Sequence, residues 1–207
     1  MIENNLLSII VAAHNQWDEF TEPMMRSLRK YNPETPVVIV DNGSSPAYPT
    51  ELDSHTLVIR SNNNSLAQAN NLGIVHSPIS KWYLTLNNDV IVSGNIEEHA
   101  AQFAEDTIYS NQIHTWTHST YAVGWCLALP RQALLDVGLY DENFIKLYYD
   151  EVDYCYRAEH YGYKIKQCYL PIMHLGKGGG SRHFNDSDNI AAINKRWFLT
   201  KHNLEKS

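Results

Sequence analysis

The residues best suited to chemistry begin with a polar triplet in the middle of the chain. Asn87, Asn88 and Asp89 stand between two apolar runs, 82–86 and 90–92. This pattern predicts a buried strand that delivers a carboxylate to its end, and ligand crevices of open α/β sheets lie at the carboxyl ends of strands. Asp89 and Asn87 are therefore suited to bind Mg2+, Mn2+ or a polar ligand. A plain strand-to-turn boundary explains the same triplet.

A second acidic group follows at Asp150, Glu151 and Asp153, where the sequence predicts the start of a helix. A carboxylate there could act as a general base toward a hydroxyl group. Negative charge also stabilises a helix N-terminus, so helix capping alone would favour the same residues. Mutual repulsion should raise at least one pKa, whereas the helix N-terminus and a metal ion would lower it. The sequence leaves that balance open.

A third polar group, Asp41 and Asn42, ends a predicted strand at 36–40. An apolar run at 6–13 predicts a preceding strand, and the helical spacing of apolar residues over 17–31 predicts the helix between them. A strand, a helix and a strand form a βαβ unit, so both strands end at the same edge. Asp41 and Asn42 could bind a base or ribose there, or could simply form an Asx turn.

The rest of the chain alternates in the same way. Strands are predicted at 56–60, at 121–129 around Gly124, and at 164–169, and a helix is predicted after Ser65. That helix contains Asn70 and Asn71, which are unfavourable inside helices, so a ligand or an adjacent loop should compensate them. The loop 177–181 could cover a site. A basic amphipathic helix at 194–203 could pack on the protein or face a membrane.

The stretch 107–120 carries histidines and a tryptophan without a recognisable ligand spacing. His114 and His118 are therefore predicted to be surface or loop residues, and Trp116 is left unassigned.

Composition limits the class of protein. The 207 residues, 43% of them apolar, predict one domain over 1–207, or one domain of a larger polypeptide. A net charge of −7 without a basic run argues against nucleic acid as a partner. Three scattered cysteines indicate a reducing compartment. With no apolar run near the roughly 20 residues of a membrane span, we expect a cytoplasmic protein, with peripheral membrane association as an alternative.

Several stretches, in this order, resemble the family 2 glycosyltransferases, particularly their bacterial rhamnosyltransferase-like branch. The matching stretches are LSIIVAAHN, VVIVDNGSS, NNSLAQANNLG, YLTLNNDV, GWCLALPRQALLDVGLYDENF, YYDEVDYCYR and the run ending at His174. No single stretch is decisive, but the ordered set covers 7–181. The resemblance implies an α/β protein of the GT-A fold, with a Rossmann-like, mostly parallel sheet flanked by helices.

The resemblance also implies roles for individual residues. Asp89 would bind Mn2+ or Mg2+ at the second acid of the family's Asp-x-Asp motif, where Asn87 replaces the first acid, and His174 would be a further metal ligand. Glu151 takes the position of the general base, with Asp150 in reserve because the family's Glu-Asp order is reversed, while Asp153 would be structural. The residues implied to bind or border the nucleotide sugar are Ala13, Asn15, Asp41, Asn42, Asn70, Asn87, Asn88 and Trp125.

The implied reaction moves a sugar from a UDP-, dTDP- or GDP-sugar to a glycan or glycolipid acceptor, and rhamnose is suggested by the branch alone. One base, with no second carboxylate for the donor, favours inversion at the anomeric carbon. Two other classes remain. A non-catalytic sugar-nucleotide or glycan-binding module could keep the same fold, although it would not need both a metal acid and a base. A nucleotidyltransferase should carry a Gly-rich, basic loop after the first strand, and residues 12–15 do not provide one.

Overall fold

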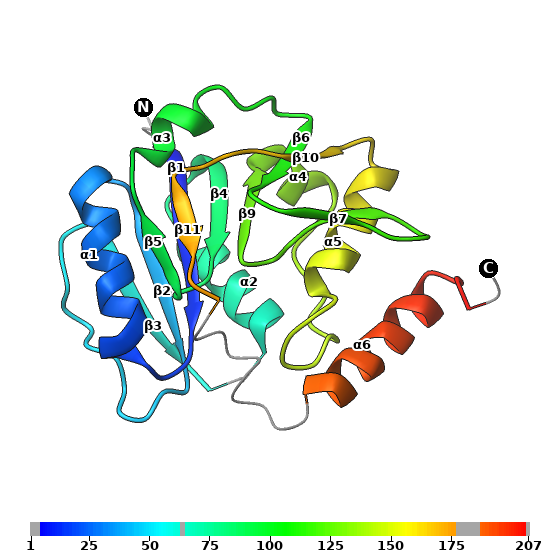
Figure 1. The fold of residues 1–207 in the computed structure, drawn as a ribbon, viewed down its shortest axis with the longest axis horizontal. Helices are drawn as coiled ribbons and strands as arrows, with labels where there is room; N and C mark the ends of the chain where they lie inside the picture. The colour runs from blue at the N-terminus through cyan, green and yellow to red at the C-terminus, as the bar shows by residue number, and fades with distance from the viewer. Residues whose placement is uncertain (1–4, 63–64, 177–186, 206–207) are drawn as a thin grey trace.

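A computed structural model describes residues 5–62, 65–176 and 187–205 (Figure 1). The loop 177–181, predicted to cover a site, lies outside these residues. The strands are β1 (Asn5–Ala13), β2 (Val37–Asn42), β3 (Thr56–Ser61), β4 (Ser80–Leu86), β5 (Val90–Val92), β6 (Thr107–Ser110), β7 (Ile113–Thr115), β8 (Thr120–Ala122), β9 (Cys126–Pro130), β10 (Lys164–Gln167) and β11 (Ile172–His174). The helices are a π-helix (Trp17–Thr21), α1 (Glu22–Tyr31), α2 (Leu66–His76), α3 (Ile96–Ala100), α4 (Arg131–Asp136), α5 (Asp150–His160) and α6 (Ser187–Lys201).

Seven strands form the central sheet in the order β10-β6-β9-β4-β1-β2-β3. Neighbouring strands are parallel except at β9, which runs antiparallel to β4 and to β6. The continuous apolar sequences of β1, β2 and β4 suit strands that are buried on both faces. The predicted α/β class and the mostly parallel sheet are therefore confirmed. Ala13 lies beside Asp41 and Val11 beside Leu86, so the polar ends of these three strands lie at one edge.

Alternate residues of β1 face two hydrophobic cores. Ile9 and Val11 belong to the core that includes Met24 and Leu28 of α1, together with β5 and β11. Ile10 faces the other core, which includes parts of α2, α4 and α5. In Figure 1, α1 accordingly lies on one side of the sheet and α5 on the other. The sheet is thus covered on both faces, as parallel sheets require.

The predicted single strand over 121–129 is wrong. The chain forms β8 and β9 there, and residues 123–125 interrupt them. Val123 N–H donates to Gln112 O at 2.9 Å, while Trp125 O accepts from Asn87 N–H at 2.9 Å. The backbone at 123–125 therefore bonds to two different segments and cannot continue one strand.

The stretch 107–120, which showed no pattern, contains β6, β7 and the beginning of β8. β7 and β8 form an antiparallel hairpin in which His114 lies opposite Tyr121. His114 is exposed on this hairpin, and His118 lies in the connection at its tip. These histidines are surface and loop residues, as predicted.

The predicted terminal helix packs on the protein. Ile190, Asn194 and Phe198, one helical turn apart, are the buried residues of α6. Phe198 has no exposed surface and contacts Phe144 and Val152. Of the two alternatives at this end, the structure has the packed helix.

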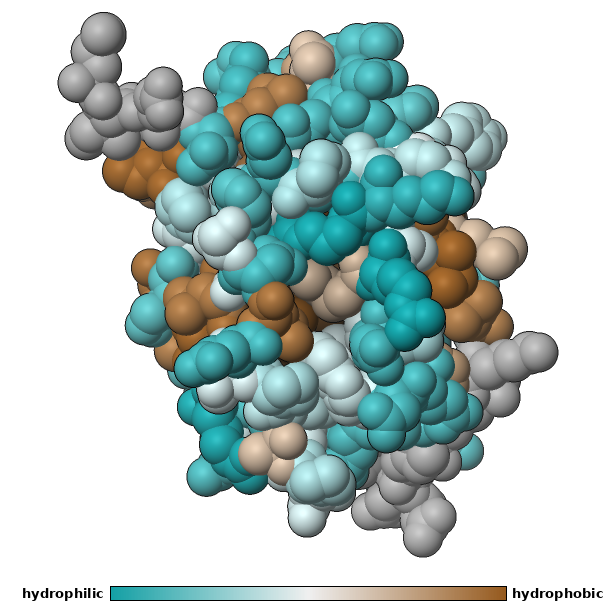
Figure 2. All heavy atoms as spheres, turned by 90° about the vertical axis from the view of Figure 1, so that its left-hand side faces the viewer, coloured by the Kyte–Doolittle hydropathy of each residue, from teal (hydrophilic) through white to brown (hydrophobic). Residues whose placement is uncertain are grey.

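The surface on the α1 side is mostly hydrophilic, with separate hydrophobic patches (Figure 2). Within the described ranges, no helix is both long and apolar enough to cross a bilayer.

Candidate active site

Asp41 shapes the loop that follows β2. Its side chain is 1% exposed and accepts hydrogen bonds from the backbone N–H groups of Ser44 at 2.9 Å and Tyr48 at 3.0 Å. Arg60 from the neighbouring β3 lies 3.4 Å from the same carboxylate. Asp41 therefore forms the Asx-type turn that was one of its two predicted roles. Its carboxylate fixes the loop beside the predicted donor site.

Asn15 joins the loops after β1 and β2, and Asn42 joins the end of β2 to the start of α2. Asn15 has a φ of 55°, and its Oδ1 accepts from Ser45 N–H at 2.8 Å. Its own N–H donates to Ser44 Oγ at 2.7 Å. The side chain of Asn42 reaches Ser65 O, before α2, at 3.4 Å. These bonds set one polar rim along the ends of β1 and β2.

A hydrogen-bonded chain then links this rim to the end of β4. Asn88 Nδ2 donates to Thr21 Oγ1 at 2.9 Å, and Thr21 Oγ1 lies 2.9 Å from Tyr48 Oη. Tyr48 Oη in turn donates to Asn15 O. Nothing in the sequence pointed to Thr21 or Tyr48, because one lies in an irregular π-helix and the other in a loop. Together they fix the positions of two predicted donor residues, Asn88 and Asn15, relative to each other.

The two predicted metal ligands meet in the structure. His174 Nε2 lies 3.1 Å from Asp89 Oδ1, although the residues are 85 positions apart. The antiparallel pair of β5 and β11 brings them together, with His174 opposite Val90. The ring of Trp125 stacks on His174 with centroids 4.9 Å apart and planes at 2°.

This pair fits a divalent cation in its donor atoms. Adjacent ligands of an octahedral ion with bonds of about 2.1 Å lie about 3 Å apart, close to the observed Oδ1–Nε2 distance. The part of the chain that the structure describes holds no group of three or more His, Cys, Asp or Glu suited to a metal. Asp89 is 0% exposed, so a neighbouring side chain must shift before a cation reaches it.

The predicted base lies at the start of α5. Asp150 is 2% exposed, and its Oδ1 accepts no hydrogen bond within the described residues. Burial raises the pKa of Asp150 to about 6. Burial and the neighbouring Asp150 charge raise the pKa of Glu151 well above its ordinary value. Both acids therefore retain protons at a pH where free carboxyl groups have lost them.

Asp153, one step along the helix, is a structural ion-pair residue, as predicted. It is fully buried and binds Arg157 at 2.8 Å, Lys201 at 2.6 Å and His202 at 2.8 Å.

One turn contacts both the candidate metal site, through His174, and the candidate base Glu151. A Cβ atom on Gly124 would lie 3.5 Å from the side chain of Glu151, so the backbone here packs directly on that acid. The next residue, Trp125, stacks on His174. The interruption between β8 and β9 thus puts a single turn against both Glu151 and His174.

The two asparagines of α2 have different surroundings. Asn71 Nδ2 donates to Tyr140 O and to Glu142 Oε1, both at 2.9 Å, and its Oδ1 accepts from Tyr140 N–H at 3.0 Å. An adjacent loop therefore compensates Asn71. Asn70 is 5% exposed beside it.

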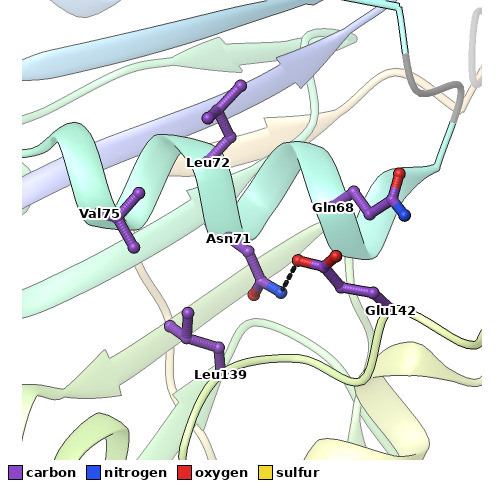
Figure 3. A pocket seen from close by; sticks show the side chains of 6 residues that line it. All are labelled: Gln68, Asn71, Leu72, Val75, Leu139 and Glu142. Atoms are coloured by element: carbon purple, nitrogen blue, oxygen red, sulfur yellow. Dashed lines mark hydrogen bonds between the residues drawn. The ribbon is translucent and has the colours of Figure 1, made fainter.

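A surface hollow of about 380 Å3 lies on this side of α2 (Figure 3). Gln68, Leu72, Val75 and Leu139 line it together with the Asn71–Glu142 pair. None of its lining residues was predicted to bind the donor, and the hollow contains no acid other than Glu142.

Comparison with known proteins gives a family model and a set of similar structures. The model described as Glycosyl transferase family 2 matches residues 8–134. No match was found among the sequences of curated proteins.

Three solved structures are similar in fold. GalNAc-T7 with UDP, GalNAc and Mn2+ has 13% identity and a TM-score of 0.64, over 95% of this chain and 50% of that one. The mannosyltransferase PcManGT from Pyrobaculum calidifontis, in complex with GDP-Man and Mn2+, has 13% identity and a TM-score of 0.68, over 99% and 66%. TarS from S. aureus has 12% identity and a TM-score of 0.57, over 98% and 44%. This chain thus spans less than two thirds of the length of each.

Proposed function

The chain belongs to glycosyl transferase family 2, and from this premise we propose that it transfers a sugar from a nucleotide-diphosphate sugar to a hydroxyl group of a glycan or glycolipid. The observation that carries the proposal is the Gly124–Trp125 turn, which packs on Glu151 on one side and on His174 on the other. A donor held at the Asp89–His174 pair and an acceptor at Glu151 would meet across this turn. The GT-A fold, with its mostly parallel sheet, supports this reading.

Asp89 and His174 are the residues that would hold Mn2+ or Mg2+. When bound, such a cation neutralises charge on the leaving diphosphate, which an acidic protein otherwise repels. The structures of GalNAc-T7 and PcManGT contain Mn2+, which makes manganese the first metal to test. Asn15, Asp41 and Asn42 would orient the nucleoside at the ends of β1 and β2.

Glu151 is the proposed general base, and Asp150 is its partner. Because burial, together with repulsion within the pair, raises the pKa of both acids, the base would titrate nearer neutral pH than a free carboxyl group, where general bases work best. Glu151 would take the proton from the acceptor hydroxyl as its oxygen forms the new bond at the anomeric carbon. The nucleoside diphosphate leaves from the opposite face as its bond to the anomeric carbon breaks, so a single displacement inverts that carbon.

The finer assignments follow from the sequence resemblance. Rhamnose is the first sugar to test because the matched stretches resemble the rhamnosyltransferase-like branch. UDP- and GDP-sugars join dTDP-rhamnose in the panel, because GalNAc-T7 was solved with UDP and PcManGT with GDP-Man. We place the protein in the cytoplasm, peripheral to a membrane where its acceptor is a glycolipid.

The second candidate is a binding module without catalysis. The observation that favours it is the complete burial of Asp89, which keeps the carboxylate from solvent while His174 and Trp125 lie as they do.

Calorimetric titration with UDP-, GDP- and dTDP-sugars, with and without Mn2+, tests the donor site. We expect one nucleotide sugar to bind, and EDTA to weaken its binding. Asp89→Asn should lose that metal dependence and weaken binding at least about 10-fold. Asp136→Asn is the matched control and should bind the donor normally. Asp136 is an exposed acid whose carboxylate accepts a hydrogen bond from Tyr163. Equal binding by Asp89→Asn and wild type would remove Asp89 from the metal site.

Glu151→Gln then separates an enzyme from a binding module. The variant should bind the donor like wild type and lose transfer by about 10²- to 10⁴-fold. Full turnover by Glu151→Gln would move the base to Asp150. Donor binding without transfer by the wild type, to any glycan or glycolipid offered, would favour the module.

A further inference from the structure

The segment that leads into the candidate base has an unusual backbone. Lys146, Tyr148 and Tyr149 have φ values of 55°, 74° and 72°, in the left-handed region that side chains other than glycine rarely adopt. Asp150 and Glu151 follow immediately. Such conformations persist only where the surroundings hold them. The position of both acids therefore depends on what fixes residues 145–149.

One side chain makes most of these contacts. Asn194 of α6 is 1% exposed, and its Oδ1 accepts from Ile145 N–H at 3.1 Å. Its Nδ2 lies 2.9 Å from Ile145 O and 3.0 Å from both Leu147 O and Tyr148 O, so its two hydrogens are shared among three carbonyl groups. A single amide from the C-terminal helix thus binds the backbone on both sides of the first left-handed residue.

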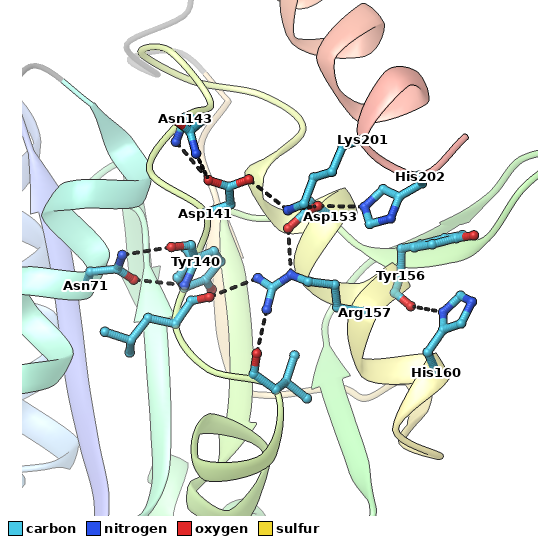
Figure 4. Close-up of polar contacts among 12 residues, drawn as sticks. Asn71, Tyr140, Asp141, Asn143, Asp153, Tyr156, Arg157, His160, Lys201 and His202 are labelled. Carbon is cyan, nitrogen blue, oxygen red and sulfur yellow. Dashed lines mark hydrogen bonds and ion pairs between the residues drawn. The ribbon is translucent and has the colours of Figure 1, made fainter. Parts of the chain in front are cut away.

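Other contacts fix α6 itself. Lys201 Nζ lies 2.6 Å from Asp153 and 2.7 Å from Asp141, and His202 Nε2 lies 2.8 Å from Asp153 (Figure 4). Asp153 belongs to α5, the helix that begins with the two candidate acids. The helix that carries Asn194 is therefore attached to the helix that carries the base.

The start of the segment also bonds to the residues that begin α2. Leu66 N–H donates to Lys146 O at 2.6 Å, and Ser65 Oγ donates to Phe144 O at 3.4 Å. Ser65 O also accepts from Asn42, at the predicted donor edge. The segment 145–149 thus connects the predicted donor edge with the candidate base. Asn194 is its contact from the C-terminal helix α6.

We propose that Asn194 is a positioning residue for transfer: it holds 145–149 in its left-handed conformation and so fixes where Asp150 and Glu151 face the acceptor. The inference rests on the proposed function. It assigns to α6 a role in the reaction that acts through the backbone of 145–149.

Asn194→Ala tests this proposal in the full chain. We expect kcat to fall about 10- to 100-fold, because a displacement of about 1 Å can cost that much. The donor Kd, measured by calorimetry, should stay within about 2-fold of wild type, since the hydrogen bonds of Asn194 go to 145–148 and not to a predicted donor residue. Hydrogen exchange of the amides at 145–153 should become faster. Asn194→Ser, which keeps one hydroxyl donor, should give an intermediate kcat and keeps the test available if the alanine variant does not fold.

Asn32→Ala is the matched control. Asn32 is also a buried asparagine that binds backbone groups of two segments: its Nδ2 donates to Gly94 O at 3.1 Å and its Oδ1 accepts from Ile96 N–H at 2.8 Å. It lies on the α1 side of the sheet, far along the chain from the candidate base. A comparable fall in melting temperature, with kcat unchanged, would show that lost stability alone does not reduce turnover.

The outcomes separate the two proposals. An active wild type with kcat unchanged in Asn194→Ala, or reduced equally in Asn32→Ala, would overturn the positioning role alone. A wild type that transfers no sugar from any donor would overturn the proposed function, and the positioning role with it.

Discussion

At the scale of single residues, Asp150 and Asp141 show how neighbours decide the charge of a carboxyl group. Burial raises the pKa of Asp150 to about 6. Burial would raise the pKa of Asp141 as well, but hydrogen bonds from Lys201 and Asn143 outweigh it and lower the value to about 2. The ionised form of Asp150 therefore destabilises the folded protein, whereas the ionised form of Asp141 stabilises it.

Asp150→Asn should make the protein more stable at pH 8. The folded-state pKa of Asp150 lies above its ordinary value of 3.8, so its contribution to stability is complete below pH 3.8 and is lost as the pH rises through about 6. The variant has no such loss, and its gain at pH 8 should be on the order of 2–3 kcal/mol. Urea denaturation at pH 4 and pH 8 measures this difference. A variant less stable than wild type at pH 8 would contradict it.

Asp141→Asn is the control of opposite sign. Its lowered pKa means that stability is present above pH 3.8 and is lost as the pH falls toward 2. The asparagine variant should therefore be less stable than wild type at pH 7, with the gap closing in acid.

Sequence reasoning reached some of the site's residues and not others. The resemblance paired Asp89 with His174, and the structure brings them to 3.1 Å. Their roles as metal ligands remain predictions. Thr21 and Tyr48, which connect Asn88 to Asn15, could not be predicted, because nothing local to either residue specifies a partner 27 or more positions away.

At the scale of elements, α2 lies unusually close to β1 because of one glycine. A Cβ atom on Gly73 would lie 2.3 Å from Cγ2 of Ile10 and 3.4 Å from Cγ2 of Val40. The helix therefore packs its backbone on the sheet at this point. This close approach fixes the distance between α2 and the sheet, and therefore the positions of Asn70 and Asn71.

Gly73→Ala should destabilise the protein although alanine is the better helix former. The clash with Ile10 should cost about 1–3 kcal/mol, more than the gain of about 1 kcal/mol from helix propensity. Ile10→Ala alone should also cost stability, but adding Gly73→Ala to it should cost nothing further, because the clashing methyl group is gone. Urea denaturation of the four proteins measures the coupling, and additive losses would show that the contact is not the cause.

Elements with strong patterns were the ones predicted correctly. The apolar runs of β1, β2 and β4 and the helical spacing in α1 gave these elements to within a few residues. The hairpin of β7 and β8 was not predicted, because its strand residues are mostly polar. Ile113 is the one large aliphatic residue in the two strands. The break at 123–125 was missed because the residues on both sides are apolar, and only contacts with Asn87 and Gln112 separate them.

At the scale of the whole molecule, α6 is the element whose attachment is least obvious from the sequence. Phe198 is fully buried against Phe144 and Val152, and Lys201 bonds to the buried Asp153. Both contacts join the C-terminal helix to α5 and to the loop before it. Whether this attachment makes the helix part of the one domain predicted from composition is a matter for unfolding experiments.

Native-state hydrogen exchange tests whether the chain unfolds as one unit. If it does, the slowest amides of α6 and of β4 should exchange with the same free energy and the same dependence on added urea, because both open only in global unfolding. Lys201→Met removes a cation from buried Asp153, so in a single cooperative unit it should lower the protection of α6 and β4 by the same free energy. Lys195→Met, whose cation lies 6.0 Å from the Trp116 ring, is the control and should leave both unchanged. Wild-type α6 amides that exchange at lower urea than those of β4 would mean that α6 is a separate cooperative unit, held to the sheet by the Asp153 contacts without sharing its unfolding.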